Sequence, residues 1–292
     1  MLYERQKKLL ALLTTFGGSV EKTDFMKYLF LYSLRESGEK FYDFVPCQYG
    51  PFSFTAYEDR EALMVEGYLF KNDSWQITQA GRMAAGKTDL FMKSFFDAVK
   101  HLKGEELIRH IYQKYPYFAI NSTTLDKFND KTLKQAVIEK RQAITPVCSM
   151  NTIGYEGHSV DSYFGKLIAS GVTILCDVRK NPLSRKRGFS KASLSNYARI
   201  MNIFYEHMPE LGIDSDKRKD LKTQSDYDRL FHIYEEEVLR KQTKALQKIE
   251  SWIEGGEIVA LTCYERLPGQ CHRRNIANFI CKAQKIERPN HL

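Results

Sequence analysis

A cysteine, a histidine and an arginine stand next to one another at residues 271–273, within the stretch EIVALTCYERLPGQCHRRNIANFI (257–280). The stretch begins as an apolar run, passes a Pro-Gly loop, and continues with the periodicity of a helix that starts near the cysteine. Backbone N–H groups at a helix start and neighbouring cationic side chains lower the pKa of a thiol. The pattern predicts that Cys271 is a nucleophilic thiolate or lies beside an anion site, next to His272 and Arg273. A structural Cys271 that packs in the core is the alternative.

Other polar residues with catalytic potential follow apolar, β-branched runs that are typical of buried strands. Asp177 lies near the end of VTILCDVR, His207 ends NIFYEH, and Glu265 comes two residues after EIVALTC. In an open parallel sheet, ligands bind beyond the carboxyl ends of the strands. We therefore expect these residues at one sheet edge together with Cys271 and His272. There Asp177, Glu265 or His207 would act as general acid or base.

The loop RKNPLSRKRGFSK (179–191) contains six basic residues and no acidic one. It directly follows a predicted buried strand. Arginine side chains in such a loop can donate paired hydrogen bonds to phosphate oxygens. We therefore expect Arg179 and Arg185 to hold anionic oxygens, together with Arg273. A solvated basic loop without a ligand is the alternative.

The cysteines also raise the question of a metal site. Six cysteines stand at irregular spacings without a Cys-x-x-Cys pair, which predicts reduced thiols and no disulfide framework. A parallel sheet could bring Cys263, Cys271 and His272 together with Cys176 or His207. The spacing between Cys263 and Cys271 fits no standard zinc site. No metal ligand is therefore predicted, and the sequence does not identify a cofactor.

The elements that must position these residues fall into two predicted domains. In the second half of the chain, short apolar strands alternate with helices, which predicts the α/β fold class with a Rossmann-like, mainly parallel sheet. Residues 1–85 show three helices followed by a hairpin and resemble a winged-helix domain, and residues 88–140 are helical. The segment RQAITPVCSM (141–150) has no periodicity. We therefore predict a winged-helix-like and helical domain over 1–145 and the α/β domain over 150–292.

The second half of the chain is similar to a known family. The motifs TIGYEGHSVDSYF, CDVRKNPLSRKRGFSK, FYEHMPELGI, DYDRLFHIYEE and VALTCYERLPGQCHRRNIA occur in order over about residues 151–285 and resemble the domain-of-unknown-function family 488. The resemblance implies a Rossmann-like α/β fold and no defined activity. One departure is Tyr264-Glu265, where relatives often carry other residues before the glutamate. The residues that match the family's motifs are Gly154, Tyr155, Asp177, Arg179, Asn181, Pro182, Ser184, Phe189, Tyr205, His207, Gly212, Glu265, Cys271, His272 and Arg273.

These motif residues coincide with the polar residues that topology places at one edge of the sheet. The residues expected to be catalytic are Cys271, His272, Asp177, Glu265 and His207. The residues expected to bind substrate are Tyr155, Arg179, Asn181, Ser184, Arg185, Lys186, Phe189, Tyr205 and Arg273.

Composition limits the partners and the compartment. The net charge of +8 and the pI of about 9.0 favour an acidic partner such as nucleic acid, a nucleotide or phosphate. No apolar run approaches the ~20 residues of a membrane span, and the N-terminus does not have the pattern of a secretory signal. A cytoplasmic protein without a membrane partner is therefore expected.

Three functions are consistent with these features. The leading hypothesis is an enzyme that acts on a phosphate-bearing substrate, nucleic acid or nucleotide, through the Cys-His-Arg and Asp-x-Arg residues, with a DNA-binding N-terminal domain. The first alternative is a non-catalytic DNA-binding regulator or sensor whose α/β domain binds an anionic ligand. The second is a scaffold in a multi-protein defence or repair system. The protein would then work as part of a complex or as a homodimer.

Overall fold

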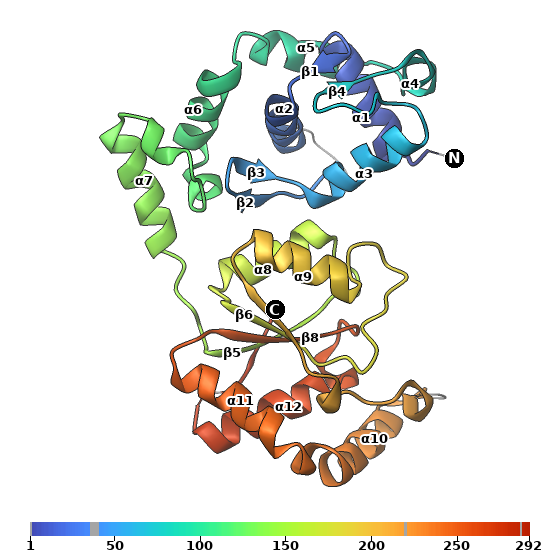
Figure 1. Ribbon diagram of the computed structural model, residues 1–292, viewed down its shortest axis with the longest axis vertical. Coiled ribbons are helices and arrows are strands. Elements are labelled where there is room, and N and C mark those ends of the chain that lie inside the picture. The colour runs from blue at the N-terminus through green and yellow to red at the C-terminus, as the bar shows by residue number, and fades with distance from the viewer. Residues whose placement is uncertain (1, 36–40, 219–220, 287) are drawn as a thin grey trace. The chain divides into compact units, whose positions relative to one another are not determined.

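The chain folds into two compact units, which the computed structural model divides between Ala143 and Ile144 (Figure 1). The structure describes residues 2–35, 41–218, 221–286 and 288–292. In these ranges, no helix combines the length and the apolar character that crossing a membrane requires.

The N-terminal unit is mostly helical and contains two small antiparallel ribbons. Its elements in chain order are α1 (Glu4–Thr15), β1 (Ser19–Val20), α2 (Lys22–Arg35), β2 (Val45–Cys47), β3 (Gly50–Phe52), α3 (Phe54–Val65), β4 (Trp75–Gln76), α4 (Gln79–Ala84), α5 (Leu90–Val99), α6 (Gly104–Lys114), the 3₁₀ turns η1 (Pro116–Ala119) and η2 (Leu125–Lys127), and α7 (Lys131–Gln142). β1 pairs with β4, and β2 pairs with β3. The side chains of Ser53 and Thr78 cap α3 and α4, as their residue types predict. The winged-helix resemblance of this unit stays a prediction.

The C-terminal unit is built on a five-stranded, all-parallel sheet in the order β7-β6-β8-β5-β9. The predicted α/β class with a mainly parallel sheet is therefore confirmed. The elements in chain order are β5 (Met150–Gly154), α8 (Val160–Ala169), β6 (Ile174–Asp177), α9 (Lys191–Ile200), β7 (Phe204–His207), η3 (Pro209–Leu211), η4 (Ser215–Arg218), α10 (Gln224–Glu237), η5 (Leu239–Lys241), α11 (Thr243–Glu254), β8 (Val259–Cys263), η6 (Pro268–Gln270), α12 (Arg273–Gln284) and β9 (Asn290–His291).

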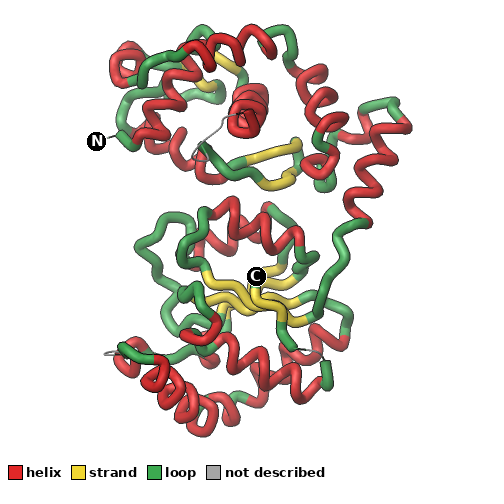
Figure 2. Tube along the Cα trace, turned by 180° about the vertical axis from the view of Figure 1, so that it is seen from behind, coloured by secondary structure: helices red, strands yellow, loops and turns green. Residues whose placement is uncertain are grey.

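Helices cover both faces of this sheet. α8 and α9 lie on one face, and α10, α11 and α12 lie on the other (Figure 1). Figure 2 shows the same three layers of the unit from behind, with the strands in the middle layer.

Side chains along each strand alternate between the two faces, which sorts the polar residues into two groups. In β6, Cys176 packs in the core beneath α10 to α12, whereas Asp177 points to the α8 and α9 face. In β8, Cys263 belongs to the same core as Cys176. Its neighbour Thr262 points the other way and accepts a hydrogen bond from Tyr163 of α8 at 2.7 Å. Asp177 and Cys263 therefore lie on opposite faces of one sheet.

The strands β5, β6, β7 and β8 end at the same edge of the sheet. Gly154 is opposite Cys263, and Asp177 is opposite both Thr262 and His207. Gly154 is also where the chain after β8 comes closest, because a Cβ atom added there would lie 1.8 Å from the carbonyl oxygen of Glu265. Only glycine allows this approach of two backbones.

Candidate functional site

A cavity of about 640 Å³ lies at the carboxyl edge of the sheet in the C-terminal unit. The loops that follow β5, β6 and β8 line it, together with the segment before α10. This is the edge at which open parallel sheets bind their ligands.

Two thiols and an imidazole lie close together beside this cavity, and we call Cys263, Cys271 and His272 the thiol cluster. Cys263 ends β8, His272 precedes the first residue of α12, and all three side chains are buried. His272 Nε2 donates a hydrogen bond to the carbonyl oxygen of Val178 at 3.0 Å. Because a carbonyl can only accept, the ring hydrogen is assigned to Nε2. His272 Nδ1 then faces Cys263 Sγ, 4.0 Å away.

The pKa values of the two thiols in the cluster shift in opposite directions. The pKa of Cys263 lies well below its ordinary value, because Cys271 donates a hydrogen bond to it and because His272 and Arg218 act in the same direction against the effect of burial. Burial raises the pKa of Cys271 well above its ordinary value, and its hydrogen bond to Cys263 acts in the same direction. The direction for Cys271 is thus opposite to the lowering expected from the helix start. Burial and the hydrogen bond to Cys263 are the causes.

An ion pair lies beside the thiol cluster. Glu265 pairs with Arg218, and their side chains are 16% and 21% exposed. Cys263 Sγ contacts Glu265 Oε2 at 3.4 Å. Burial raises the pKa of Glu265, and Cys263 adds to this effect, whereas Arg218 opposes it. Cys263, His272, Glu265 and Arg218 all line the cavity, so each of them can reach a bound ligand.

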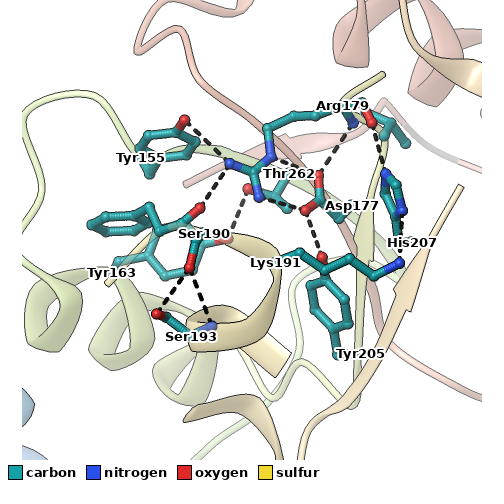
Figure 3. Close-up of polar contacts among 12 residues, drawn as sticks. Tyr155, Tyr163, Asp177, Arg179, Ser190, Lys191, Ser193, Tyr205, His207 and Thr262 are labelled. Carbon is teal, nitrogen blue, oxygen red and sulfur yellow. Dashed lines mark hydrogen bonds and ion pairs between the residues drawn. The ribbon is translucent and has the colours of Figure 1, made fainter. Parts of the chain in front are cut away.

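A second polar group lies on the other face of the sheet, and we call Asp177, Arg179, Tyr155 and Tyr205 the Asp177 cluster (Figure 3). Arg179 donates to both oxygens of Asp177, with Nε–Oδ1 at 2.8 Å and Nη2–Oδ2 at 2.6 Å. Its Nη1 atom donates to the hydroxyl of Tyr155 at 3.2 Å and to the carbonyl oxygen of Phe189 at 2.8 Å. Tyr205 donates its hydroxyl hydrogen to Asp177 Oδ2 at 2.7 Å. Both charged groups are therefore fully bonded inside the protein.

The basic loop after β6 forms one wall of the cavity. Its residues Lys180, Asn181, Ser184, Arg185 and Lys186 line the cavity. Lys186 Nζ donates to the carbonyl oxygen of Tyr155 at 3.0 Å. Lys180 and Arg185 are exposed, and neither forms an ion pair with any residue that the structure describes. Their charges are available to an anion in the cavity.

Comparison with known proteins identifies the family of this unit. Residues 159–280 match the model of a protein family described as "Domain of unknown function DUF488". The C-terminal unit is a DUF488 domain. The predicted resemblance of the second half of the chain is thus confirmed. No curated protein and no solved structure matches the chain.

The structure brings most of the predicted site residues of the DUF488 domain to one cavity. Those that line it are Tyr155, Arg179, Asn181, Ser184, Arg185, Lys186, Glu265 and His272. The predicted residues that do not line it are Cys271, Asp177, His207, Phe189, Tyr205 and Arg273.

The predicted residues outside the cavity hold other parts of the DUF488 domain in place. Arg273 is 1% exposed, and its two terminal nitrogens donate to the carbonyl oxygens of Glu265 and Arg266. Its guanidinium therefore fixes the loop that carries Glu265. His207 Nε2 donates to the carbonyl oxygen of Arg179 at 2.9 Å. Phe189 stacks on Tyr155 with ring centres 4.6 Å apart. We assign these residues positioning roles.

Several residues that line the cavity were not predicted as site residues, and Cys263, Tyr264 and Arg218 are among them. Cys263 has a signal in the sequence, because it is the last residue of an apolar strand and stands two positions before Glu265. Tyr264 follows it and is 45% exposed. Arg218 has no such signal, since it comes from a short 3₁₀ turn that no periodic pattern marks.

Proposed function

We propose that the DUF488 domain is an enzyme that binds a phosphate-bearing substrate, a nucleotide or nucleic acid, and acts on it at Cys263, His272 and Glu265. One observation carries the proposal. A single cavity is lined on one side by the basic loop and on the other by a thiol, an imidazole and a carboxylate. Binding groups and reactive groups thus have access to the same ligand.

The basic loop supplies the recognition of phosphate. Lys180, Arg185 and Lys186 line a cavity in which Glu156 and Glu265 are the acidic residues. Glu265 is already neutralised by Arg218. Arg179 takes part only indirectly, because Asp177 and two further acceptors hold its guanidinium. In this proposal Arg179 keeps the start of the loop in place.

The opposite wall supplies the reacting groups. Glu265 is held by Arg218, and His272 is oriented by the carbonyl oxygen of Val178. A carboxylate or an imidazole in a fixed orientation can transfer a proton to or from a bound substrate. Glu265 is the proposed general acid or base, and Cys263 is the proposed contact to the reacting group. Cys271 is left out of this role because it does not line the cavity.

Anion binding can be tested with two variants and a control from the same loop. We expect Arg185→Ala and Lys186→Ala each to weaken binding of pyrophosphate and nucleoside diphosphates about tenfold or more, since a charge-assisted hydrogen bond is worth roughly 1.5–3 kcal/mol. Arg187→Ala is the control, because Arg187 has the same charge but does not line the cavity. Isothermal titration calorimetry on the full chain measures the affinities. If all three variants lose the same affinity, the effect comes from net charge alone, and the proposed anion site is contradicted.

Turnover separates the enzyme from the non-catalytic sensor. The full chain is incubated with a panel of nucleotides and phosphorylated oligonucleotides, and the products are followed by phosphate release and mass spectrometry. Binding without conversion of any member of the panel would favour a sensor whose α/β domain holds an anion. If no member of the panel binds, both the enzyme hypothesis and the sensor hypothesis are wrong.

DNA contact by the N-terminal unit stays a prediction outside this proposal, and the charges of helix α3 do not add support to it. In a helix-turn-helix arrangement the third helix would enter the major groove. Here α3 carries Glu58, Asp59 and Glu61 against the single cation Arg60. Arg60 turns its guanidinium toward the carbonyl oxygens of Asn72 and Ser74. Asp59 is buried and pairs with Arg5, and Glu61 pairs with Arg60, so these charges hold α3 in place within the unit.

A further inference from the structure

We propose that the thiol cluster binds one zinc ion, with Cys263, Cys271 and His272 as protein ligands and the fourth position directed into the cavity. The ligand atoms of these three residues all lie within 4.8 Å of one another. Two of the three ligands, Cys263 and His272, also line the cavity. The inference rests on the proposed function and revises it in one respect: the ion, held by Cys263 and His272, would contact the reacting group in place of the Cys263 sulfur, and Glu265 keeps its role as general acid or base.

The separations suit a tetrahedral ion after small adjustments. Zn–S bonds of about 2.3 Å and Zn–N bonds of about 2.0 Å place tetrahedral ligand atoms roughly 3.5–3.8 Å apart. Cys263 Sγ and His272 Nδ1 are 4.0 Å apart. A shift of a few tenths of an ångström would close this pair onto the ion, and the other separations, all within 4.8 Å, require at most about 1 Å more.

The imidazole has the orientation of a metal ligand. In metal sites the ring nitrogen that does not bind the ion commonly donates its hydrogen to a carboxylate or a backbone carbonyl. His272 Nε2 donates in this way to Val178, at the end of the neighbouring strand. This hydrogen bond leaves the lone pair of Nδ1 directed toward Cys263.

The rest of the fold holds the ligands in place. Cys263 is the last residue of a fully buried strand, and Cys271 and His272 immediately precede α12. The loop between them is fixed by Arg273, which donates to the carbonyl oxygens of Glu265 and Arg266. A site whose ligands are already positioned loses little freedom when it binds an ion.

The donor set favours zinc over the hard cations. Thiolate and imidazole ligands suit zinc, whereas magnesium and calcium require oxygen ligands. Three protein ligands with one open position are typical of catalytic zinc sites. Cys263 and His272 line the cavity and Cys271 does not, so the open position faces the cavity. Zinc at that position would act as a Lewis acid toward a phosphoryl oxygen.

Zinc titration of the full chain tests the proposal directly. The wild-type protein is treated with a chelator, dialysed and titrated with Zn²⁺ and with Co²⁺. We expect one equivalent to bind, and the cobalt form to show thiolate-to-cobalt charge transfer and the visible bands of a tetrahedral ion. Absence of stoichiometric binding by the wild-type protein overturns the proposal. So does a cobalt spectrum without thiolate charge transfer.

Substitutions locate the ion. Cys263→Ser and Cys271→Ser should each lower zinc stoichiometry to well below one per chain, as measured by elemental analysis. Cys281→Ser is the matched control, since Cys281 is another buried thiol of the same core outside the thiol cluster. If the control loses zinc to the same extent, or if both cluster variants retain it, the assignment is wrong.

A measurement on the wild-type protein covers the case in which the variants do not fold. Zinc should protect Cys263 and Cys271 from alkylation after brief exposure to denaturant, whereas Cys148 should react equally with and without zinc. Equal labelling of all three thiols would overturn the site. The result is distinguishable from a failure of the proposed function, because pyrophosphate binding and its loss in Arg185→Ala are measured separately.

Discussion

The Asp177 cluster and the thiol cluster belong to the same sheet but differ in how many of their polar atoms are already bonded. In the Asp177 cluster, the carboxylate accepts from Arg179 and Tyr205, and the guanidinium donates to three different residues. Asp177 is 0% exposed and Arg179 is 5% exposed. Both carboxylate oxygens and all three guanidinium nitrogens have partners inside the protein, as is typical of buried polar groups that stabilise a fold.

The thiol cluster and its neighbour Glu265 border the cavity and are held by longer contacts. Cys263 also interacts with Cys271 and Arg218, but its sulfur is 3.4 Å from Glu265 Oε2 and 4.0 Å from His272 Nδ1, compared with 2.6–2.8 Å between Arg179 and Asp177. Both clusters contain residue types that serve in catalysis. The difference shows that residue type and burial alone do not identify a candidate reactive group. The group must also present an atom to a cavity in which a ligand can bind.

The largest loss of stability is expected from Asp177→Asn. The substitution leaves the Arg179 guanidinium buried beside a neutral amide, and breaking a buried ion pair in this way costs about 3–5 kcal/mol. Urea unfolding followed by circular dichroism measures the free energy of unfolding. A variant that is as stable as the wild type but has lost ligand binding or turnover would mean that Asp177 acts on the ligand after all.

A smaller loss is expected from Tyr205→Phe. The substitution removes one hydrogen bond to Asp177 Oδ2, and hydrogen bonds to charged groups contribute roughly 1.5–3 kcal/mol. Tyr227→Phe is a control from the cavity wall. The same unfolding experiment compares the two variants. If both have the stability of the wild type, the Asp177 cluster is not held together as described.

The sequence is sufficient to predict a mainly parallel sheet and the edge at which the candidate site lies. Alternating apolar strands and helices predict parallel strands, although not their order or the short strand β9, and the carboxyl ends of β6 and β8 then carry Arg179 and Glu265 to one edge. The basic loop is visible as a run of cations after a buried strand. Because these features depend on neighbours along the chain, local patterns are enough to find them.

The choice between Cys263 and Cys271 could not be made from the sequence. The helix start favours an ionised Cys271, but the burial of that residue and its hydrogen bond to Cys263 depend on how β8 packs against α12. The pairing of Arg179 with Asp177, rather than with a ligand, likewise depends on side-chain geometry that no spacing records. Arg218 reaches Glu265 from 47 residues away, through a turn without a periodic pattern.

The smallest loss of stability, together with the largest loss of activity, is expected from Glu265→Gln. Both partners of the Glu265–Arg218 pair are partly exposed, so Arg218 can be solvated when the carboxylate is removed, and the cost should be about 1 kcal/mol. Turnover of any substrate found in the nucleotide panel should fall by a factor of about 10² or more, the usual contribution of a general acid or base. Glu206→Gln is the matched control, because Glu206 pairs with Lys248 away from the cavity. Unfolding and turnover are measured on the same preparations. If Glu265→Gln were as unstable as Asp177→Asn and kept its turnover, the Glu265 carboxylate would have a structural role. The proposed difference between the Asp177 cluster and the groups at the cavity would then be wrong.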